Sequence, residues 1–317
     1  MKEIGGYFGL EQLVSNEYYK NLIPLNAARY SLLYILKAKN IKKIYLPTYL
    51  CNVVRDMCLK YSYEIEYYCI GEDFLPIFDK NLAKDEYIFI VNYFGQITDE
   101  KILLLRDRFE RLVLDNAQSF FQRPLNGVDT IYSCRKFFGV PEGAYLSTVA
   151  KLNEEIEVDI SKNRMTHILG RFEGEASDYF QNYQEHKLLF DDEPLKYMSK
   201  LSHNILGAID YDNAARIRNE NYVYLASKLG KLNRLSLVTP EGPFAYPFYI
   251  KNGIEVRKKL AKKKIYIPIL WPNALDETPQ DSVEHDYVAN ILPLPCDQRY
   301  GIDEMKFMVS EVSKYTA

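Results

Sequence analysis

Short, continuously apolar runs alternate with helical segments through the first half of this sequence. Six runs have the length and composition of strands, at residues 42–47, 63–70, 86–94, 111–115, 129–133 and 144–149. Segments with helical periodicity, for example 97–109, lie between them. Apolar runs of this kind are typical of strands buried on both faces, and their alternation with helices favours a parallel sheet. We therefore predict an α/β fold with a mostly parallel sheet.

The second half of the sequence has a different pattern. Residues 150–235 are predicted to form helices and loops, including a helix over 210–229 that has Asp210 and Asp212 as candidate N-caps. Helical spacing places four apolar side chains near one face of this helix. They are Ala214, Ile217, Leu225 and Leu229.

The last hundred residues suggest a second, smaller α/β unit. The pattern predicts a strand at 247–252, a helix at 253–263, a strand at 264–270 and a final helix at 302–315. The chain has 317 residues, which is enough for a large and a small domain. We therefore expect a large domain over residues 1–210 and a small C-terminal domain over 211–317.

Composition excludes several classes of function. The net charge of −3 gives no electrostatic basis for binding nucleic acid, and the basic run 257–264 lies on a predicted helix, where a solvated face is its ordinary explanation. Five cysteines without C-x-x-C spacing and four scattered histidines predict no metal site. Because no signal peptide or membrane-length apolar run is present, we expect a cytoplasmic protein with reduced thiols and no membrane partner.

Two ionisable residues follow neighbouring predicted strands. Asp115 ends the run 111–115, and Lys136 follows the run 129–133. Singly, such an aspartate is usually a turn or cap residue and such a lysine a surface charge. In a parallel sheet, however, ligands bind beyond the carboxyl ends of the strands. If strands that follow each other in sequence are also neighbours in the sheet, the carboxylate and the amine lie at adjacent strand ends, and such a pair suits one cofactor, pyridoxal 5′-phosphate (PLP).

PLP requires a lysine that binds it covalently, a carboxylate at its ring nitrogen and a cradle for its phosphate. The segment 25–38 offers a cradle, because a turn of small residues runs directly into a helix that carries Arg29. The alternative interpretation of this segment is an ordinary helix start capped by Asn26.

Several segments resemble the DegT/StrS sugar aminotransferases, a family of fold-type-I PLP enzymes in the aspartate aminotransferase superfamily. The specific pair is "LVLDNAQSF" (112–120), similar to the family's D-x-A-[HQ]-S cofactor segment, and "YSCRKFFGVPEGA" (132–144), similar to its lysine segment. "GGYFGLE" (5–11), "NAARYSLLYIL" (26–36) and "YLPTYLCNVV" (45–54) support it. The resemblance runs nearly end to end and implies a large PLP-binding domain and a small C-terminal domain.

The resemblance also implies roles for individual residues. Lys136 corresponds to the lysine that binds PLP, and Asp115 to the partner of the pyridine nitrogen. Gln118 corresponds to the residue against the ring or its phenolic oxygen. The implied phosphate contacts are Ser133 together with Ala28, Arg29 and Tyr30.

The sequence departs from the family pattern at identifiable positions. Ser133 and Lys136 are three residues apart, where many members have five, and Ala28 stands where glycine is common. Leu195–Lys196–Tyr197 replaces the Asn-Tyr-Arg that reaches the neighbouring subunit's cofactor in the family. The chain is also short for the family.

The resemblance implies a PLP-dependent aminotransferase that uses an amino donor and a nucleotide-linked keto-sugar in polysaccharide or glycoside biosynthesis. One alternative is sugar dehydration, although relatives with that activity carry histidine where this chain has Lys136. Another is a PLP-fold protein that binds a ligand or regulates without turnover. A homodimer is implied as well, and aromatic residues between 150 and 210 are candidates for its interface. They are Phe172, Tyr179, Phe180, Tyr183, Phe190 and Tyr197.

Overall fold

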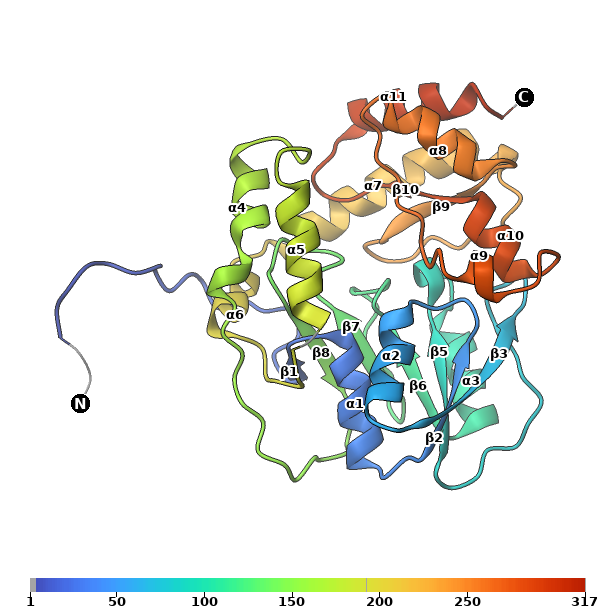
Figure 1. The fold of residues 1–317 in the computed structure, drawn as a ribbon. Coiled ribbons are helices and arrows are strands. Elements are labelled where there is room, and N and C mark those ends of the chain that lie inside the picture. The colour runs from blue at the N-terminus through green and yellow to red at the C-terminus, as the bar shows by residue number, and fades with distance from the viewer. Residues whose placement is uncertain (1–3, 192, 317) are drawn as a thin grey trace.

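A twisted sheet forms the centre of the molecule (Figure 1). The computed structural model describes residues 4–191 and 193–316, and in this part of the chain eight strands form the sheet in the order β1-β8-β7-β6-β5-β2-β3-β4. The strands are β1 (Ile23–Leu25), β2 (Lys43–Pro47), β3 (Glu64–Ile70), β4 (Pro76–Ile77), β5 (Glu86–Val91), β6 (Leu112–Asp115), β7 (Asp129–Ser133) and β8 (Ala144–Ser147). The five strands from β7 to β3 run parallel, whereas β1, β4 and β8 pair antiparallel. The predicted α/β fold with a mostly parallel sheet is confirmed.

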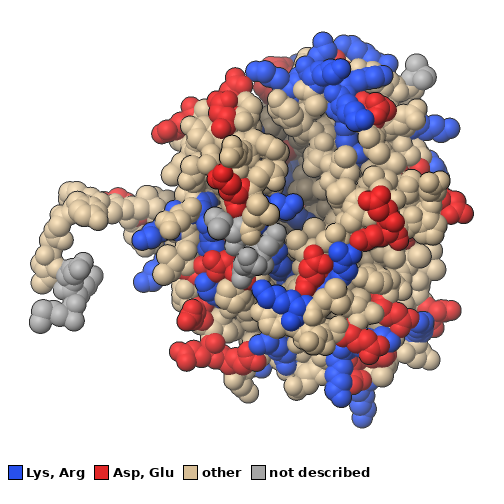
Figure 2. All heavy atoms as spheres, in the orientation of Figure 1, with Lys and Arg blue, Asp and Glu red and all other residues tan. Residues whose placement is uncertain are grey.

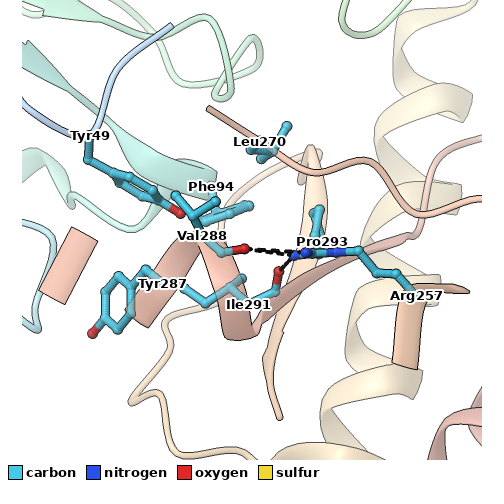
Figure 3. A pocket seen from close by; sticks show the side chains of 8 residues that line it. All are labelled: Tyr49, Phe94, Arg257, Leu270, Tyr287, Val288, Ile291 and Pro293. Atoms are coloured by element: carbon cyan, nitrogen blue, oxygen red, sulfur yellow. Dashed lines mark hydrogen bonds between the residues drawn. The ribbon is translucent and has the colours of Figure 1, made fainter. Parts of the chain in front are cut away.

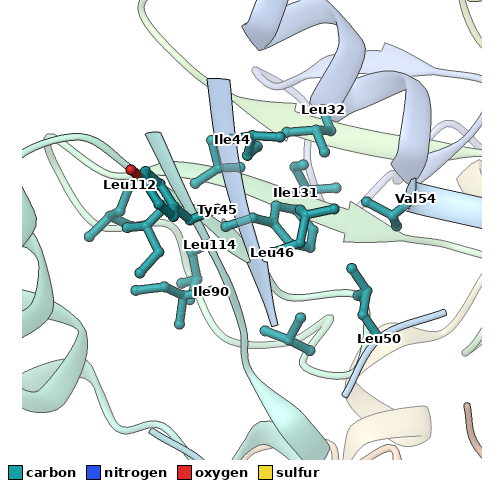
Figure 4. Close-up of a cluster of buried hydrophobic side chains, with 14 of the residues drawn as sticks. Leu32, Ile44, Tyr45, Leu46, Leu50, Val54, Ile90, Leu112, Leu114 and Ile131 are labelled. Atoms are coloured by element: carbon teal, nitrogen blue, oxygen red, sulfur yellow. The ribbon is translucent and has the colours of Figure 1, made fainter. Parts of the chain in front are cut away.

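Helices pack against the sheet and bury its central strands. Helices α1 (Ala28–Ala38), α2 (Asn52–Lys60) and α3 (Asp99–Phe109) each connect two of the strands. Side chains of α1 and α2 meet those of the strands in one apolar cluster (Figure 4). Strands β5, β6 and β7 are buried along most of their length, including positions that face opposite sides of the sheet. Their continuous apolar runs therefore reflect burial on both faces.

In Figure 1 the remaining elements lie beside the β1 end of the sheet and above the sheet. The helices are α4 (Thr166–Glu173), α5 (Phe180–Asp191), α6 (Lys200–Gly207), α7 (Tyr211–Leu229), α8 (Gly253–Ala261), α9 (Ala274–Glu277), α10 (Val283–Asn290) and α11 (Ile302–Ser313). Strands β9 (Ala245–Tyr249) and β10 (Ile291–Pro295) pair antiparallel, and α7, α8 and α11 share an apolar cluster with them. A domain boundary near residue 210 remains a prediction.

Two features of the C-terminal region differ from the sequence-based expectations. The predicted strand 264–270 is wrong, because this stretch is irregular, with left-handed backbone at Lys264 and at Trp271 just beyond it. Pro268 in its middle also removes a main-chain donor. The strand that pairs with β9 is instead β10, whose two prolines are tolerated because the sheet has only two strands and β10 is an edge.

The basic run 257–264 lies on and just after α8. Its lysines are exposed, and Figure 2 shows Lys and Arg side chains gathered over this end of the molecule. Arg257, by contrast, is buried. The interpretation as a solvated helix face therefore holds for the lysines and is wrong for Arg257.

Within residues 4–191 and 193–316, no helix is both long and apolar enough to cross a bilayer. The same residues contain no group of three His, Cys, Asp or Glu side chains that could hold a metal ion. All five cysteines are free thiols.

Candidate active site

The structure brings Asp115 and Lys136 to neighbouring strand ends. Strands β6 and β7 are parallel neighbours, with Asp115 opposite Ile131, so the turn that carries Lys136 begins two residues beyond that pair. The pKa of Asp115 is raised by burial, while the positive charge of Lys136 and the amide of Ala117 act in the opposite direction. The Ala117 amide donates to Asp115 Oδ1 at 2.8 Å. The aspartate is thus held by its main chain and lies within electrostatic reach of the lysine.

The two phenylalanines that follow Lys136 anchor its turn. The amides of Phe137 and Phe138 donate to the carbonyl of Cys134 at 3.0 and 2.9 Å, which closes the turn. Both rings are buried in an aromatic cluster, whereas the Lys136 side chain is exposed, with Nζ 5.9 Å from the centroid of the Phe244 ring. The bulky neighbours therefore fix the main chain and leave the amine accessible.

The side-chain amide of Gln118 is buried, and its N–H donor has no hydrogen-bond acceptor among the described residues. Its side chain is 2% exposed, and its Oε1 accepts from the amide of Phe94 at 2.7 Å. Its Nε2 has no hydrogen-bond partner. An unsatisfied buried amide costs about 1–3 kcal/mol. Such a donor, three residues after Asp115 in the sequence, suits a ligand oxygen such as the phenolic oxygen of PLP.

Helix α1 begins beside Ser133 and lacks a capping side chain. Leu25, Ala144 and Ser133 lie side by side across β1, β8 and β7, so the turn into α1 lies at the same sheet edge as Lys136. The N-cap residue is Ala27, which has no side-chain oxygen. The expected cap at Asn26 is therefore wrong, whereas the choice between a phosphate cradle and an ordinary helix start remains open. A helix start without a side-chain cap suits a phosphate group.

The side chain of Asn26 instead joins this turn to a distant segment. Its Nδ2 donates to the carbonyl of Pro194 at 2.8 Å, and its Oδ1 accepts from the amide of Lys196 at 3.2 Å. Its main-chain carbonyl accepts from the amide of Gly143 at 2.9 Å. The turn before α1, the lysine loop and residues 194–196 are thereby tied together.

Two arginines lie close to the start of α1. Burial lowers the pKa of Arg135, and the positive charge of Arg29 lowers it further. The Arg29 guanidinium also lies 5.2 Å from the centroid of the Tyr30 ring, and the Tyr30 hydroxyl donates to the carbonyl of Glu193. The positive charge suits an anion such as phosphate.

Gly143 occupies a backbone conformation that side chains rarely adopt. Its φ is +134°, and a Cβ there would lie 3.3 Å from Met198 Cε. We predict that Gly143→Ala lowers the free energy of unfolding by about 1–3 kcal/mol, the cost of such a conformation in a non-glycine residue. Gly139→Ala in the same loop is the matched control, because φ is not positive there and the new methyl would meet only Ile168 Cγ2, at 3.6 Å. Urea unfolding measures both, and equal losses would contradict the assigned strain.

Two hollows lie near these residues. A closely packed crevice with no room for a water molecule is lined by Tyr49 and Phe94 on one side and by Arg257 and neighbouring C-terminal residues on the other (Figure 3). None of the predicted cofactor residues lines it. Figure 2 shows a hollow between α5 and the C-terminal elements. In the same orientation, the carboxyl ends of the central strands point toward that hollow (Figure 1).

No protein-family model and no curated protein sequence matches this chain. Solved structures do match it. A DegT/DnrJ/EryC1/StrS aminotransferase from Brucella abortus has a TM-score of 0.62 at 12% identity, covering 93% of this chain and 86% of that one. The sugar aminotransferase CalS13 from Micromonospora echinospora has a TM-score of 0.61 at 13% identity, with 92% and 87% covered. NtdA from Bacillus subtilis, with bound PMP (pyridoxamine 5′-phosphate), has a TM-score of 0.64 at 12% identity, with 95% and 74% covered.

This chain has the fold of the DegT/DnrJ/EryC1/StrS aminotransferases. That fold is the type-I fold of PLP-dependent enzymes, which agrees with the resemblance seen in the sequence. The residues present fit PLP on three observations of this structure: the unpaired Nε2 of Gln118, the start of α1 without a side-chain cap, and the juxtaposition of Asp115 with Lys136. The roles of the individual residues remain predictions.

Some contacts of this DegT/StrS-type fold had no signal in the sequence pattern. Phe244 lies beside the Lys136 amine, and Arg218 and Gln298 bond to the carbonyl of Phe137, more than 80 residues away in each case. Arg218 lies within the predicted helix 210–229 and Gln298 between the predicted elements 264–270 and 302–315, and neither was singled out by the sequence pattern.

Proposed function

We propose that this protein is a PLP-dependent aminotransferase that transfers an amino group from a small amino donor to a keto-sugar. The observation that carries the proposal is the pairing of Asp115 and Lys136 at adjacent strand ends of a type-I fold. An acid and an amine at that edge serve both ends of one pyridine ring. PLP, when bound, supplies an electron sink for the negative charge that forms on the substrate carbon.

The proposal assigns a task to each residue. Lys136 Nζ would hold the cofactor, and its free amine would move the proton at the substrate carbon. Asp115 holds the proton on the ring nitrogen. Gln118 Nε2 donates to the phenolic oxygen. The start of α1, where Ala28, Arg29 and Tyr30 begin the helix, would hold the phosphate together with Ser133 at the end of β7.

A nucleotide-linked keto-sugar is the proposed acceptor. The support is the sugar aminotransferase CalS13 among the structures with this fold. The hollow between α5 and the C-terminal elements has Lys and Arg side chains at its floor, which suit the phosphates of a nucleotide-sugar (Figure 2).

A half-reaction tests the proposal. The PLP-loaded protein is mixed with each amino acid in turn, and the cofactor's absorbance is followed. We expect at least one donor to convert the PLP spectrum to that of PMP, and a keto-sugar nucleotide to restore it. Lys136→Ala is the control and should do neither. A protein that binds PLP but converts it with no donor would be the non-catalytic binding protein named above.

We also propose that the protein is a homodimer. Residues 4–14 extend away from the body, and Ile4, Tyr7 and Phe8 are at least 94% exposed (Figure 1). Apolar side chains in this setting suit a protein partner. The arm is anchored where Leu13 donates to Asn204 Oδ1 at 2.8 Å.

The aromatic residues predicted for an interface fall into two groups. Phe172, Phe180 and Tyr183 are exposed on α4 and α5, whereas Tyr179 and Tyr197 are partly buried within their own chain. The side chain of Phe190 lies outside the described residues. The exposed three add to the apolar surface available to a second copy.

Light scattering at low micromolar concentration should report twice the chain mass of 37.1 kDa. Replacing Tyr7 and Phe8 together by serine should shift the mass toward the monomer, because these side chains have no partner surface in their own chain. Phe307→Ser is the matched control, since Phe307 is an exposed aromatic on α11, away from the arm. A monomeric, PLP-loaded wild-type protein would contradict the dimer.

A further inference from the structure

Arg218 is a buried arginine whose hydrogen bonds reach the main chain beside Lys136. Its side chain is 1% exposed. Nη2 donates to the carbonyl of Phe137 at 3.1 Å, and Nη1 donates to the carbonyl of Pro243 at 2.8 Å. Nε donates to Gln298 Oε1 at 2.6 Å. One acceptor therefore belongs to the residue directly after Lys136.

The second carbonyl belongs to the residue directly before Phe244. The Lys136 amine lies 5.9 Å from the centroid of the Phe244 ring. Arg218 thus holds the main chain next to the lysine and the main chain next to the ring against which its amine lies. Its guanidinium also lies over the Phe137 ring, 4.6 Å from the centroid.

Gln298 completes this arrangement from a different segment. Its Nε2 donates to the carbonyl of Phe137 at 2.8 Å, while its Oε1 accepts from Arg218. The Phe137 carbonyl therefore accepts two hydrogen bonds, which uses both of its lone pairs. Two side chains from the C-terminal third of the chain therefore donate to one carbonyl of the turn 134–138, which carries Lys136.

The cost of burying Arg218 indicates that its geometry matters. None of its three acceptors carries a charge, and burial lowers the pKa of Arg218 to about 10. A buried ion with neutral partners contributes little net stability, and an apolar residue of similar volume often serves as well. What an apolar residue lacks is the planar fork that fixes several acceptors at once.

We propose that Arg218 and Gln298 are positioning residues for Lys136, which hold the turn 134–138 so that the amine projects toward the cofactor end of β6. The inference rests on the proposed function in one respect, that Lys136 is the residue that binds PLP. The hydrogen bonds themselves do not depend on it.

Arg257 provides a matched control. It is also buried, at 6% exposure, and its guanidinium bonds only to main-chain carbonyls, those of Val288 and Ile291 (Figure 3). Burial lowers its pKa to about 10, as it does for Arg218. Arg257 and Arg218 thus share burial and bonds to main-chain carbonyls, but of the two only Arg218 bonds to the turn 134–138.

The first measurement is hydrogen exchange in the protein without cofactor. In Arg218→Met, the amides of Phe137 and Phe138 should exchange about tenfold faster, since the turn loses a charge-assisted bond. Gln298→Leu removes the second bond with less disturbance of the core and should act in the same direction. Arg257→Met should leave these two amides unchanged. Unchanged exchange in folded Arg218→Met and Gln298→Leu would overturn the proposal.

The second measurement separates placement of the amine from binding of the cofactor. PMP cannot bond covalently to a lysine, so its affinity reports the other contacts, whereas borohydride fixation of PLP reports the reach of Lys136. In Arg218→Met we expect PMP affinity within about twofold of wild type and fixation on Lys136 slower by about ten- to a hundredfold, as for a displaced reacting group. Arg218→Lys should recover part of the fixation rate.

Equal losses of PMP affinity and fixation would show a merely structural role and overturn the proposal, as would the same loss of fixation in Arg257→Met. A wild-type protein that binds no PMP and is not labelled at Lys136 would instead contradict the proposed function. The hydrogen-exchange result would then test only whether Arg218 and Gln298 hold the turn 134–138.

Discussion

Lys136→Ala should yield a folded protein on which borohydride fixes no PLP, whereas the wild-type protein should be yellow and labelled at Lys136. The substitution should cost little stability, because the side chain is exposed and the turn is held by its neighbours and by its main chain. Mass spectrometry of peptides from the reduced protein locates the adduct. The loss of the PLP label should be complete, because Lys136 is the only described lysine whose charge shifts the pKa of Asp115.

Lys151→Ala serves as the control for this experiment, because Lys151 is an exposed lysine in the loop after β8. Its label should match that of wild type. An adduct on a lysine other than Lys136 would remove the site assignment, and with it the assigned role of Asp115.

Asp115→Asn should lower turnover by on the order of hundreds-fold or more, the scale found when a charge-stabilising group is lost. Asparagine keeps the shape of the side chain and can still accept from the Ala117 amide through Oδ1. It cannot hold the proton of a pyridinium nitrogen by charge. PLP binding should therefore persist while turnover falls, and steady-state kinetics with absorbance titration measures the two separately.

The same substitution should not reduce the stability of the cofactor-free protein. The pKa of Asp115 is raised by burial, so its ionised form is less favourable in the folded state than in the unfolded chain. Stability is therefore lost as the pH rises from the ordinary value through the raised pKa, and asparagine avoids that loss at neutral pH. Thermal unfolding at pH 7 should show an equal or higher midpoint for Asp115→Asn.

Asp129→Asn is the contrasting control, because Asp129 is a buried aspartate at the other end of β7 that pairs with Lys39 at 2.5 Å. It should lose stability and keep turnover. Near-normal activity in Asp115→Asn would show that Asp115 does not hold the proton on the ring nitrogen.

The parallel core was predictable from the sequence because each strand is a local pattern. The runs 111–115 and 129–133 correspond almost residue for residue to β6 and β7, and Asp210 caps α7 by accepting from the amide of Asn213 at 3.0 Å. Apolar periodicity and capping chemistry act over a few residues, so they leave a readable signal.

Which side chains of α7 are buried was less predictable, for a physical reason. Ile217 was expected on the buried face of its helix, but it is only partly buried and the adjacent Arg218 is fully buried instead. A pattern of apolar residues treats arginine as solvated, because its acceptors on Phe137 and Pro243 are set by tertiary folding alone.

The candidate site also contains residues whose positions were predictable from local patterns and contacts that were not. The positions of Asp115 and Lys136 followed from strand order, whereas the unpaired Nε2 of Gln118 depends on the left-handed backbone of Phe94, whose amide occupies the Oε1. No local pattern announces a phenylalanine with φ of 55°. The residue could be named from a resemblance, but its free donor could not.

The ties between Asn26 and residues 194–196 have a consequence for protein engineering. Their hydrogen bonds join two segments that are about 170 residues apart in the sequence. The start of α1 is therefore fixed by the position of residues 194–196 and not by the length of the chain that connects them. A chimera that exchanges the stretch between Ser147 and Glu193 for a longer or shorter one could therefore keep the turn at α1 in place.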